Sequence, residues 1–597
     1  MRGAAALVPG LLFIAVFLIF DLKILTRYLR HDEAAWTDEA CVILFIWIVF
    51  WANAFLLRDR EQITFDLLYT PMPQGVRRVL AIARQLLVGG IFLWSLPGAL
   101  DYLAFLWRER TPVMGLRFDL VYSCFGLFMA AVVARAAGHL AGRPARPQLA
   151  RQGLIHGLPG LHGLHGLHGL SVLLGIFGLA AALGAPLGTA MLAAGFAYLL
   201  ATHQDVGLVV DQTMNGLYNS YLLIAVPLFI FVANIMNASG VIERLLAFGA
   251  ALVGHLPGGL AQVNVVSNLI FSGMSGSAVA DASGPGLIVA RMMARGGRYP
   301  RGFAAATSVV SATLGPLMPT SIPMIFYALI ANASVGAMFL GGLVPAGLMA
   351  ASLMGVIALV ARRRGFPREV RVPWAAIPAV FGRAILPLAL PGLLLGMIYS
   401  GLTTPTEAAA IAATYALLLA LVVYRTLRLR SLLTVVTDTV RATAMIALIM
   451  AGAFVFNYAV ANENVPQAIR GVLLAWDLPP TGFLLCVDLL MLLLAVVLDE
   501  VTILLVIVPL LVPIAQALGI DLVHFGIVVV LNMMVGLTLP PHGLLLFVMS
   551  GLTGTPLGEI FREVPPFIVA MLGVVLAVTF LPDLALALPR VAGLVKP

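Results

Sequence analysis

Long apolar segments recur along the whole chain, and most charged residues lie between them. Four such segments come first, at about residues 7–27, 40–57, 79–107 and 119–139. A helix rises about 1.5 Å per residue, so each segment is long enough to cross a hydrocarbon core of about 30 Å. The pattern therefore predicts an N-terminal unit of four membrane helices, residues 1–142.

Residues 143–170 interrupt this pattern and predict a linker. They contain the run Leu161-His-Gly-Leu-His-Gly-Leu-His-Gly169, in which a glycine stands at every third position. Each glycine disfavours a helix by about 1 kcal/mol relative to alanine. Metal binding by the histidines of this run is an alternative, but no cysteine or carboxylate completes a closed site, and repeat expansion in a tolerant linker is favoured.

The region 171–597 shows an internal duplication. Two of its apolar segments are interrupted, at Gly315-Pro-Leu-Met-Pro-Thr-Ser-Ile-Pro323 and at Gly536-Leu-Thr-Leu-Pro-Pro-His-Gly543. Proline lacks an N–H and clashes with the preceding helical turn, so a helix must break at each place. A polar stretch precedes each break by a similar distance, 315 − 275 = 40 residues from Ser275 and 536 − 499 = 37 residues from Asp499. We predict two repeats of hairpin plus broken helix, at about 221–347 and 440–575, with inverted topology.

Composition narrows the class of protein. Of the 597 residues, 61% are hydrophobic and only 10% are charged, which excludes an ordinary soluble domain. Continuous apolar runs favour helices over a barrel of alternating strands. Lys and Arg exceed Asp and Glu by 35 − 27 = 8, which we attribute to basic loops on the cytoplasmic side of a bilayer and not to a nucleic-acid surface. The prediction is an all-α polytopic membrane protein.

Chemical motifs of enzymes are not apparent in the sequence. The three cysteines lie in apolar segments and suggest neither a disulfide framework nor a transition-metal site. We find no zincin helix, no Gly-x-Ser-x-Gly elbow and no phosphate-binding loop, so an enzyme and an ATP-driven pump are both disfavoured.

The second region contains several distinctive motifs. They are Pro227-Leu-Phe-Ile230 with Asn234, Ser272-Gly-Met-Ser-Gly-Ser-Ala-Val-Ala-Asp281, Gly315-Pro-Leu-Met-Pro319, Thr404-Pro-Thr-Glu-Ala408, Asp521-Leu-Val-His-Phe-Gly526 and Gly536-Leu-Thr-Leu-Pro-Pro541. These motifs resemble those of the large membrane component of tripartite ATP-independent periplasmic (TRAP) transporters. The first unit resembles the small membrane component through Arg27-Tyr28, Trp36, Glu39, Trp47 and Asp66. The chain thus resembles a fused permease of the branch that pairs with dicarboxylate-type binding proteins.

This resemblance implies a multi-pass permease of the bacterial inner membrane. It implies sodium-coupled uptake of a small organic acid that a periplasmic substrate-binding protein hands over. It also implies an elevator motion of a transport domain against a scaffold that the first unit enlarges. An alternative is a stand-alone sodium- or proton-coupled anion symporter that needs no binding protein.

Sodium is a hard cation that backbone carbonyl and hydroxyl oxygens can bind, and broken helices expose such groups. The predicted sodium ligands of the first site are Ser272, Ser275, Gly315, Met318 and Thr320. Those of the second site are Ala495, Gly536, Thr538, Leu539 and His542. Helix N-termini at the hairpin tips and beyond the breaks favour an anion. We expect the substrate carboxylate near Ser275, Ser277, Thr320, Ser321, Thr502 and Asn532.

A single Ser or Thr in a helix more often bonds back to a carbonyl of the preceding turn, so only the clustering at breaks favours a ligand role. Three carboxylates at or near breaks, Asp281, Asp499 and Glu407, are predicted to be structural or capping residues, with ion binding as the alternative at the two aspartates.

The chain departs from the family pattern at each break. Thr320 stands where a proline is usual, Ala495 where a glycine is usual, and Leu539 where a threonine is usual. His542 follows the two prolines, so proton coupling is an open variant.

Overall fold

The computed structural model describes residues 2–30, 34–58, 61–64, 73–141, 168–465, 467, 471, 479–496, 498, 500–541 and 543–595. Eleven helices within these ranges are long and apolar enough to cross a membrane. The first four, Ala5–Leu29, Trp36–Leu56, Gly75–Arg108 and Phe118–His139, confirm the four predicted spans. The fold is that of an all-α polytopic membrane protein. Apart from its last residues, the predicted linker lies outside the described residues.

The chain divides into two compact units. The first consists of Met1–Ile19, Glu33–Tyr221 and Val440–Gly471, and the second of Phe20–Asp32, Leu222–Thr439 and Val472–Pro597. These units follow contacts in space, so they interleave along the chain and do not coincide with the predicted linear boundaries.

The first unit is a bundle of helices. It contains the first part of α1 (Arg2–Arg30), α2 (Trp36–Trp51), α4 (Gln74–Phe105), α5 (Phe118–Ala141), α6 (His168–Ala182), α7 (Leu187–Ala201), α8 (Gly207–Asn219) and the later part of α19 (Leu429–Asn462). Helix α4 packs against α5, α7 and α8. The Tyr102 hydroxyl donates to Asp211 over 2.8 Å, which satisfies two polar groups between apolar helices.

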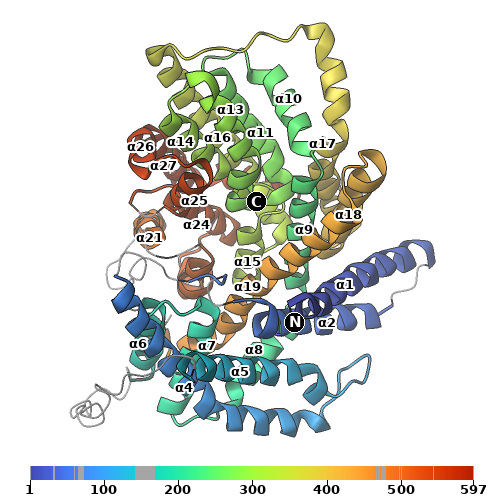
Figure 1. Ribbon diagram of the computed structural model, residues 1–597, viewed down its shortest axis with the longest axis vertical. Coiled ribbons are helices and arrows are strands. Elements are labelled where there is room, and N and C mark those ends of the chain that lie inside the picture. Colours follow the sequence, from blue (N-terminus) through green and yellow to red (C-terminus); the bar gives the residue numbers. More distant parts are fainter. Residues whose placement is uncertain are drawn as a thin grey trace. The chain divides into compact units, whose positions relative to one another are not determined.

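The second unit contains the first predicted repeat. From residue 225 to residue 418, the helices of the second unit are α9 (Ala225–Ala238), α10 (Val241–Val253), α11 (Gly259–Ser275), α12 (Ala278–Asp281), α13 (Leu287–Ala294), α14 (Arg301–Ala312), α15 (Ile322–Ala331), α16 (Val335–Arg364), α17 (Ile377–Tyr399) and α18 (Pro405–Leu418). Helices α17 and α18 lie beyond the predicted end of the repeat, at about residue 347. Helices α11, α13, α14 and α16 lie side by side in Figure 1, and α11 packs on the other three.

The second predicted repeat follows in the same unit. From residue 480 onward, the helices of this unit are α21 (Pro480–Ala495), α22 (Glu500–Thr502), α23 (Val508–Ala517), α24 (Leu522–Gly536), α25 (Leu544–Thr553), α26 (Leu557–Glu563), α27 (Pro565–Phe580) and α28 (Asp583–Val591). Helix α28 lies beyond the predicted end of the repeat, at about residue 575. Helix α24 packs on α21 and α27 and also on α15 of the first repeat. Both predicted helix breaks are present, between Ala312 and Ile322 and between Gly536 and Leu544.

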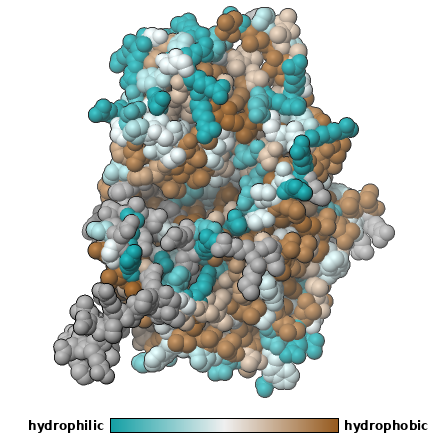
Figure 2. Space-filling model, viewed as in Figure 1, coloured by the Kyte–Doolittle hydropathy of each residue, from teal (hydrophilic) through white to brown (hydrophobic). Residues whose placement is uncertain are grey.

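Large hydrophobic side chains remain at the surface, as a membrane protein requires. On α4 they include Leu86, Leu93 and Trp94, which is 76% exposed. Figure 2 shows broad stretches of hydrophobic residues on the face in view.

Candidate functional site

The tip of the first hairpin is a tight turn between α11 and α12. Helix α11 ends at Ser275, Gly276 follows in a left-handed conformation (φ +60°), and Ser277 begins α12. The Ser277 hydroxyl accepts the Ala280 N–H at 3.4 Å and so caps the new helix. A side chain at Gly276 would place its Cβ only 2.0 Å from the Thr320 carbonyl oxygen. The hairpin tip therefore lies directly on the first helix break.

The first break is a short 3-10 turn, Gly315–Leu317, followed by α15. The Ser321 hydroxyl caps α15 by accepting the Met324 N–H at 3.2 Å, and it donates to the Pro316 carbonyl at 2.6 Å. The Met318 carbonyl accepts the Ser321 N–H at 3.1 Å. A carbonyl oxygen has two lone pairs, so one hydrogen bond leaves Met318 an acceptor for a cation.

Thr320 is strained at this break. Its φ is +85°, a region that a β-branched residue rarely adopts, and its side chain is fully buried. Such a conformation costs about 1–3 kcal/mol and persists where the surroundings enforce it, often at functional sites. The Thr320 hydroxyl donates to the Ser272 carbonyl at 3.4 Å, which ties the break to α11.

Asp281 is the carboxylate of this cluster. It is fully buried and accepts the Ser272 hydroxyl at 2.7 Å and also the Ser275 hydroxyl. A Cβ on Gly315 would lie 2.6 Å from its Oδ2. The helix cap at this tip is Ser277, so the carboxylate that the sequence suggested as a cap lies instead among the predicted sodium ligands.

The first cluster thus brings together most of the residues predicted for it. They are Ser272, Ser275, Ser277, Gly315, Met318, Thr320 and Ser321, with Asp281 added. All of them offer oxygen atoms, which suits a hard monovalent cation.

The second break packs against the first helix of the second hairpin. A Cβ on Gly536 would lie 2.0 Å from the Ala495 Cβ, so glycine at 536 makes room for the alanine that replaces the usual glycine at 495. The Leu539 N–H donates to the Gly536 carbonyl at 3.1 Å. The Thr538 hydroxyl bonds back to the Val535 carbonyl at 2.8 Å. Two predicted residues of this region, His542 and Asp499, lie outside the described residues.

The helix that leads into the second break packs on the first break within the second unit, because α24 contacts both Gly315–Leu317 and α15. The remaining predicted substrate ligands lie in the second repeat, where Thr502 ends α22 and Asn532 lies in α24, both fully buried. Both N–H groups of the Asn532 amide are in use, since Nδ2 donates to Asp488 at 2.6 Å and to the Val528 carbonyl at 2.9 Å.

Asp488 was missed in the sequence analysis. It is 5% exposed, lies within apolar α21, and accepts from Asn532 and, at 3.0 Å, from Thr579 on α27. The available signal was the charge itself, since an ionisable residue inside a membrane helix is a functional candidate by default.

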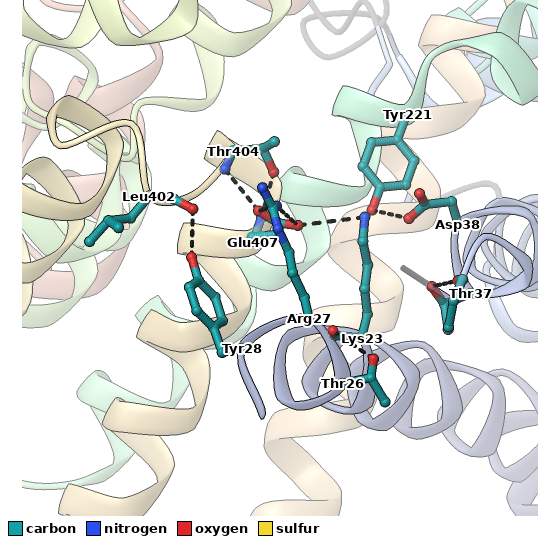
Figure 3. A network of polar contacts seen from close by, with 11 residues as sticks. Lys23, Thr26, Arg27, Tyr28, Thr37, Asp38, Tyr221, Leu402, Thr404 and Glu407 are labelled. Atoms are coloured by element: carbon teal, nitrogen blue, oxygen red, sulfur yellow. Dashed lines mark hydrogen bonds and ion pairs between the residues drawn. The ribbon is translucent and has the colours of Figure 1, made fainter. Parts of the chain in front are cut away.

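Glu407 lies in the first turn of α18, within a network of polar contacts (Figure 3). Its carboxylate accepts the Thr404 N–H at 2.9 Å, and the Thr404 hydroxyl accepts the Glu407 N–H, which completes a capping box. Arg27 on α1 reaches both carboxylate oxygens, at 2.9 and 3.0 Å, and the Lys23 ammonium lies 3.6 Å away. Glu407 therefore fixes a helix start and holds two cations of the second unit.

Comparison with protein families divides the chain into two matches. Residues 174–584 match the model "Tripartite ATP-independent periplasmic transporter, DctM component", and residues 16–145 match the model of the DctQ component of the same transporters. The DctM match alone covers more than half of the chain.

Individual relatives agree with this division. The sialic acid TRAP transporter large permease protein SiaM of Vibrio cholerae is 38% identical over 68% of this chain and 95% of its own length. Two relatives align along nearly the whole chain. The sialic acid TRAP transporter permease protein SiaT of Haemophilus influenzae is 29% identical over 97% of each protein. The isethionate TRAP transporter permease protein DctMQ of Oleidesulfovibrio alaskensis is 30% identical over 96% of this chain and 92% of its own length.

Both membrane components are therefore present in one polypeptide, with apolar spans throughout. Permeases of this kind work with a periplasmic substrate-binding protein. The chain belongs to the tripartite ATP-independent periplasmic transporter family, as a fused permease of the inner membrane, and is a transport protein rather than an enzyme.

Proposed function

We propose that this chain couples the inward movement of sodium to the uptake of a small organic acid that a periplasmic substrate-binding protein delivers. The observation that carries the proposal is the pair of helix breaks, each packed against a hairpin and connected by contacts of α24 with the first break. Paired interruptions of this kind form the binding sites of many secondary transporters.

Sodium fits the first cluster by its chemistry. The cluster supplies one carboxylate, five hydroxyls and several backbone carbonyls, and six of its eight residues are buried, the exceptions being Ser277 and Met318. Oxygen-only ligands of this kind favour a hard cation. A bound cation would also offset the charge of Asp281, which is costly to bury alone.

An anionic substrate fits the same region. Helix α15 begins at the first break with its N–H groups and positive dipole end near the hairpin tip. The relatives are named for sialic acid, C4-dicarboxylates and isethionate, which are all small acids. We therefore propose a carboxylate or similar acid as the transported class, bound near Ser275, Ser277, Thr320 and Ser321.

We also propose that transport proceeds by an elevator motion. Ser272, Ser275, Asp281, Thr320 and Ser321 of the first cluster are buried, so we infer that the bound ion and substrate need a movement of the site itself to reach both sides of the membrane. In this motion the first cluster would move with the helices that carry it, and the surrounding helices would form the static scaffold.

Uptake into proteoliposomes tests the proposal. The full chain is reconstituted with or without a candidate binding protein, and with or without an inward sodium gradient, and labelled small carboxylates are supplied outside. We expect uptake only when both the binding protein and sodium are present. Uptake with sodium but without a binding protein would instead establish the stand-alone symporter, and uptake driven by a pH gradient alone would establish proton coupling.

A further inference from the structure

A second buried carboxylate, Asp488, has no role in the proposed sites. It lies in the middle of α21, two helical turns before Ala495, and is 5% exposed. Its polar contacts among the described residues are with two neutral donors, the Asn532 amide on α24 at 2.6 Å and the Thr579 hydroxyl on α27 at 3.0 Å. Three helices of the second unit therefore converge on one negative charge.

The Asn532 amide is fixed in orientation. A carboxylate only accepts hydrogen bonds, so the amide must present its NH₂ group to Asp488. The second N–H is taken by the Val528 carbonyl at 2.9 Å. The Oδ1 of Asn532 remains without a hydrogen-bond partner, although the residue is fully buried. Asn532 therefore offers an acceptor and has no donor left for a substrate carboxylate.

Further oxygens lie around the same point. The Thr579 hydroxyl has one hydrogen, yet it lies 3.0 Å from both Asp488 Oδ2 and the Val575 carbonyl. Carboxylate, amide, hydroxyl and carbonyl oxygens from three helices thus gather with a net negative charge. A buried charge with only neutral partners is costly, and a cation would offset it while also using the unpaired Oδ1.

We propose that Asp488, Asn532 and Thr579 bind a sodium ion in addition to those at the two helix breaks. This inference rests on the proposed sodium coupling. Asn532 lies one helical turn before Gly536, so an ion here would sit beside the second break and link α21 to α24 and α27. It also reassigns Asn532 from a substrate ligand to a cation ligand.

Equilibrium binding of ²²Na⁺ to the purified full chain tests the proposal without need of a substrate or partner. We expect Asp488→Asn to lose one bound sodium per chain relative to the unsubstituted protein. Thr579→Val should raise the sodium concentration for half-saturation of that ion by about tenfold, because it removes one ligand of a charged group.

Thr307→Val is the matched control. Thr307 is also a fully buried threonine that bonds back to a carbonyl four residues earlier, at 2.8 Å, but its hydroxyl has no carboxylate partner among the described contacts. Its sodium binding should equal that of the unsubstituted chain. Size-exclusion profiles in sodium-free buffer report folding, and Thr579→Val carries the test if Asp488→Asn does not fold.

The outcomes separate this inference from the proposed function. If the unsubstituted chain binds sodium and Asp488→Asn binds the same number of ions, the Asp488 site is overturned and sodium coupling stands. If the unsubstituted chain binds no sodium, both are overturned. A change confined to the pH dependence of transport would show that Asp488 carries a proton and would also overturn the site.

Discussion

At the residue scale, two left-handed backbone positions hold the first hairpin tip against the first break. Gly276 adopts φ +60° and Thr320 adopts φ +85°. Glycine tolerates this region without strain, whereas threonine does not. The strain at Thr320 is maintained by close contact with Gly276 and by the hydrogen bond to Ser272. Both positions serve to bring backbone oxygens and hydroxyls into one cluster.

Substitution of Gly276 tests this contact. Gly276→Ala should abolish uptake and lower the thermal midpoint, because its Cβ would meet the Thr320 carbonyl at 2.0 Å. We expect a loss of stability of about 1–3 kcal/mol beyond the backbone penalty. The control is Gly296→Ala, which has a similar φ of +68° and open space around the added methyl group. Equal midpoints and equal uptake in the two variants would contradict the close packing of tip and break.

The residues of the first cluster were predictable, because Gly, Pro and hydroxyl side chains in an apolar run mark a helix break. The contacts of the buried carboxylates with these side chains were not predictable. Asp281 bonds Ser272 and Ser275 only because a turn folds α12 back onto α11. Asp488 lies 44 residues before Asn532 and 91 residues before Thr579. A local sequence pattern cannot show contacts over such separations.

At the element scale, α1 and α18 form an antiparallel polar seam within the second unit. Along α1 the contacts run from Asp21 with Thr414, at 2.8 Å, through Arg27 with Glu407, to Tyr28 with the Leu402 carbonyl at 2.5 Å. Figure 3 shows the Arg27 and Lys23 side chains reaching toward Glu407. The seam pairs charges that would be costly alone in an apolar environment.

Removal of the Glu407 charge should weaken this seam. Glu407→Gln keeps an acceptor for the capping box but removes the negative charge that Arg27 and Lys23 contact, and we expect the free energy of unfolding to fall by about 2 kcal/mol. This is below the about 3–5 kcal/mol typical of a fully buried pair, because Arg27 is 36% exposed. The thermal midpoint of the purified chain is the measurement.

The matched control is Glu369→Gln, which breaks the Arg298–Glu369 pair at 3.0 Å. The Arg298 and Glu369 side chains are 52% and 30% exposed, so we expect the free energy of unfolding to fall by only about 0–1 kcal/mol. The explanation of the seam is wrong if the two variants shift the midpoint equally.

The start of α18 carries local signals in the sequence, because Thr404 is a capping residue type and Pro405 follows it in the first turn. The sequence did not predict the partners of Glu407, because Arg27 lies 380 residues earlier. Periodicity identifies elements and their ends, whereas contacts between distant elements depend on the folded arrangement.

At the scale of the whole molecule, the two compact units do not correspond to the two family matches. Residues 20–32 fall in the DctQ match but belong to the second unit, and residues 174–221 fall in the DctM match but belong to the first. The small component is thus built into both units. Domain boundaries inferred from composition could not predict these units, because composition describes segments in chain order and not the contacts between distant segments.

The central claim is that the first cluster couples sodium to transport. The most direct measurement is the sodium concentration for half-maximal uptake in Ser275→Ala and in Ser283→Ala, with the full chain and its binding protein in proteoliposomes. Ser275 donates to buried Asp281, whereas Ser283 is exposed and bonds only to the Ala280 carbonyl, at 3.2 Å, among its described contacts. We predict that Ser275→Ala raises this concentration about tenfold and that Ser283→Ala leaves it unchanged. An unchanged value in Ser275→Ala, with uptake still dependent on sodium, would contradict the claim.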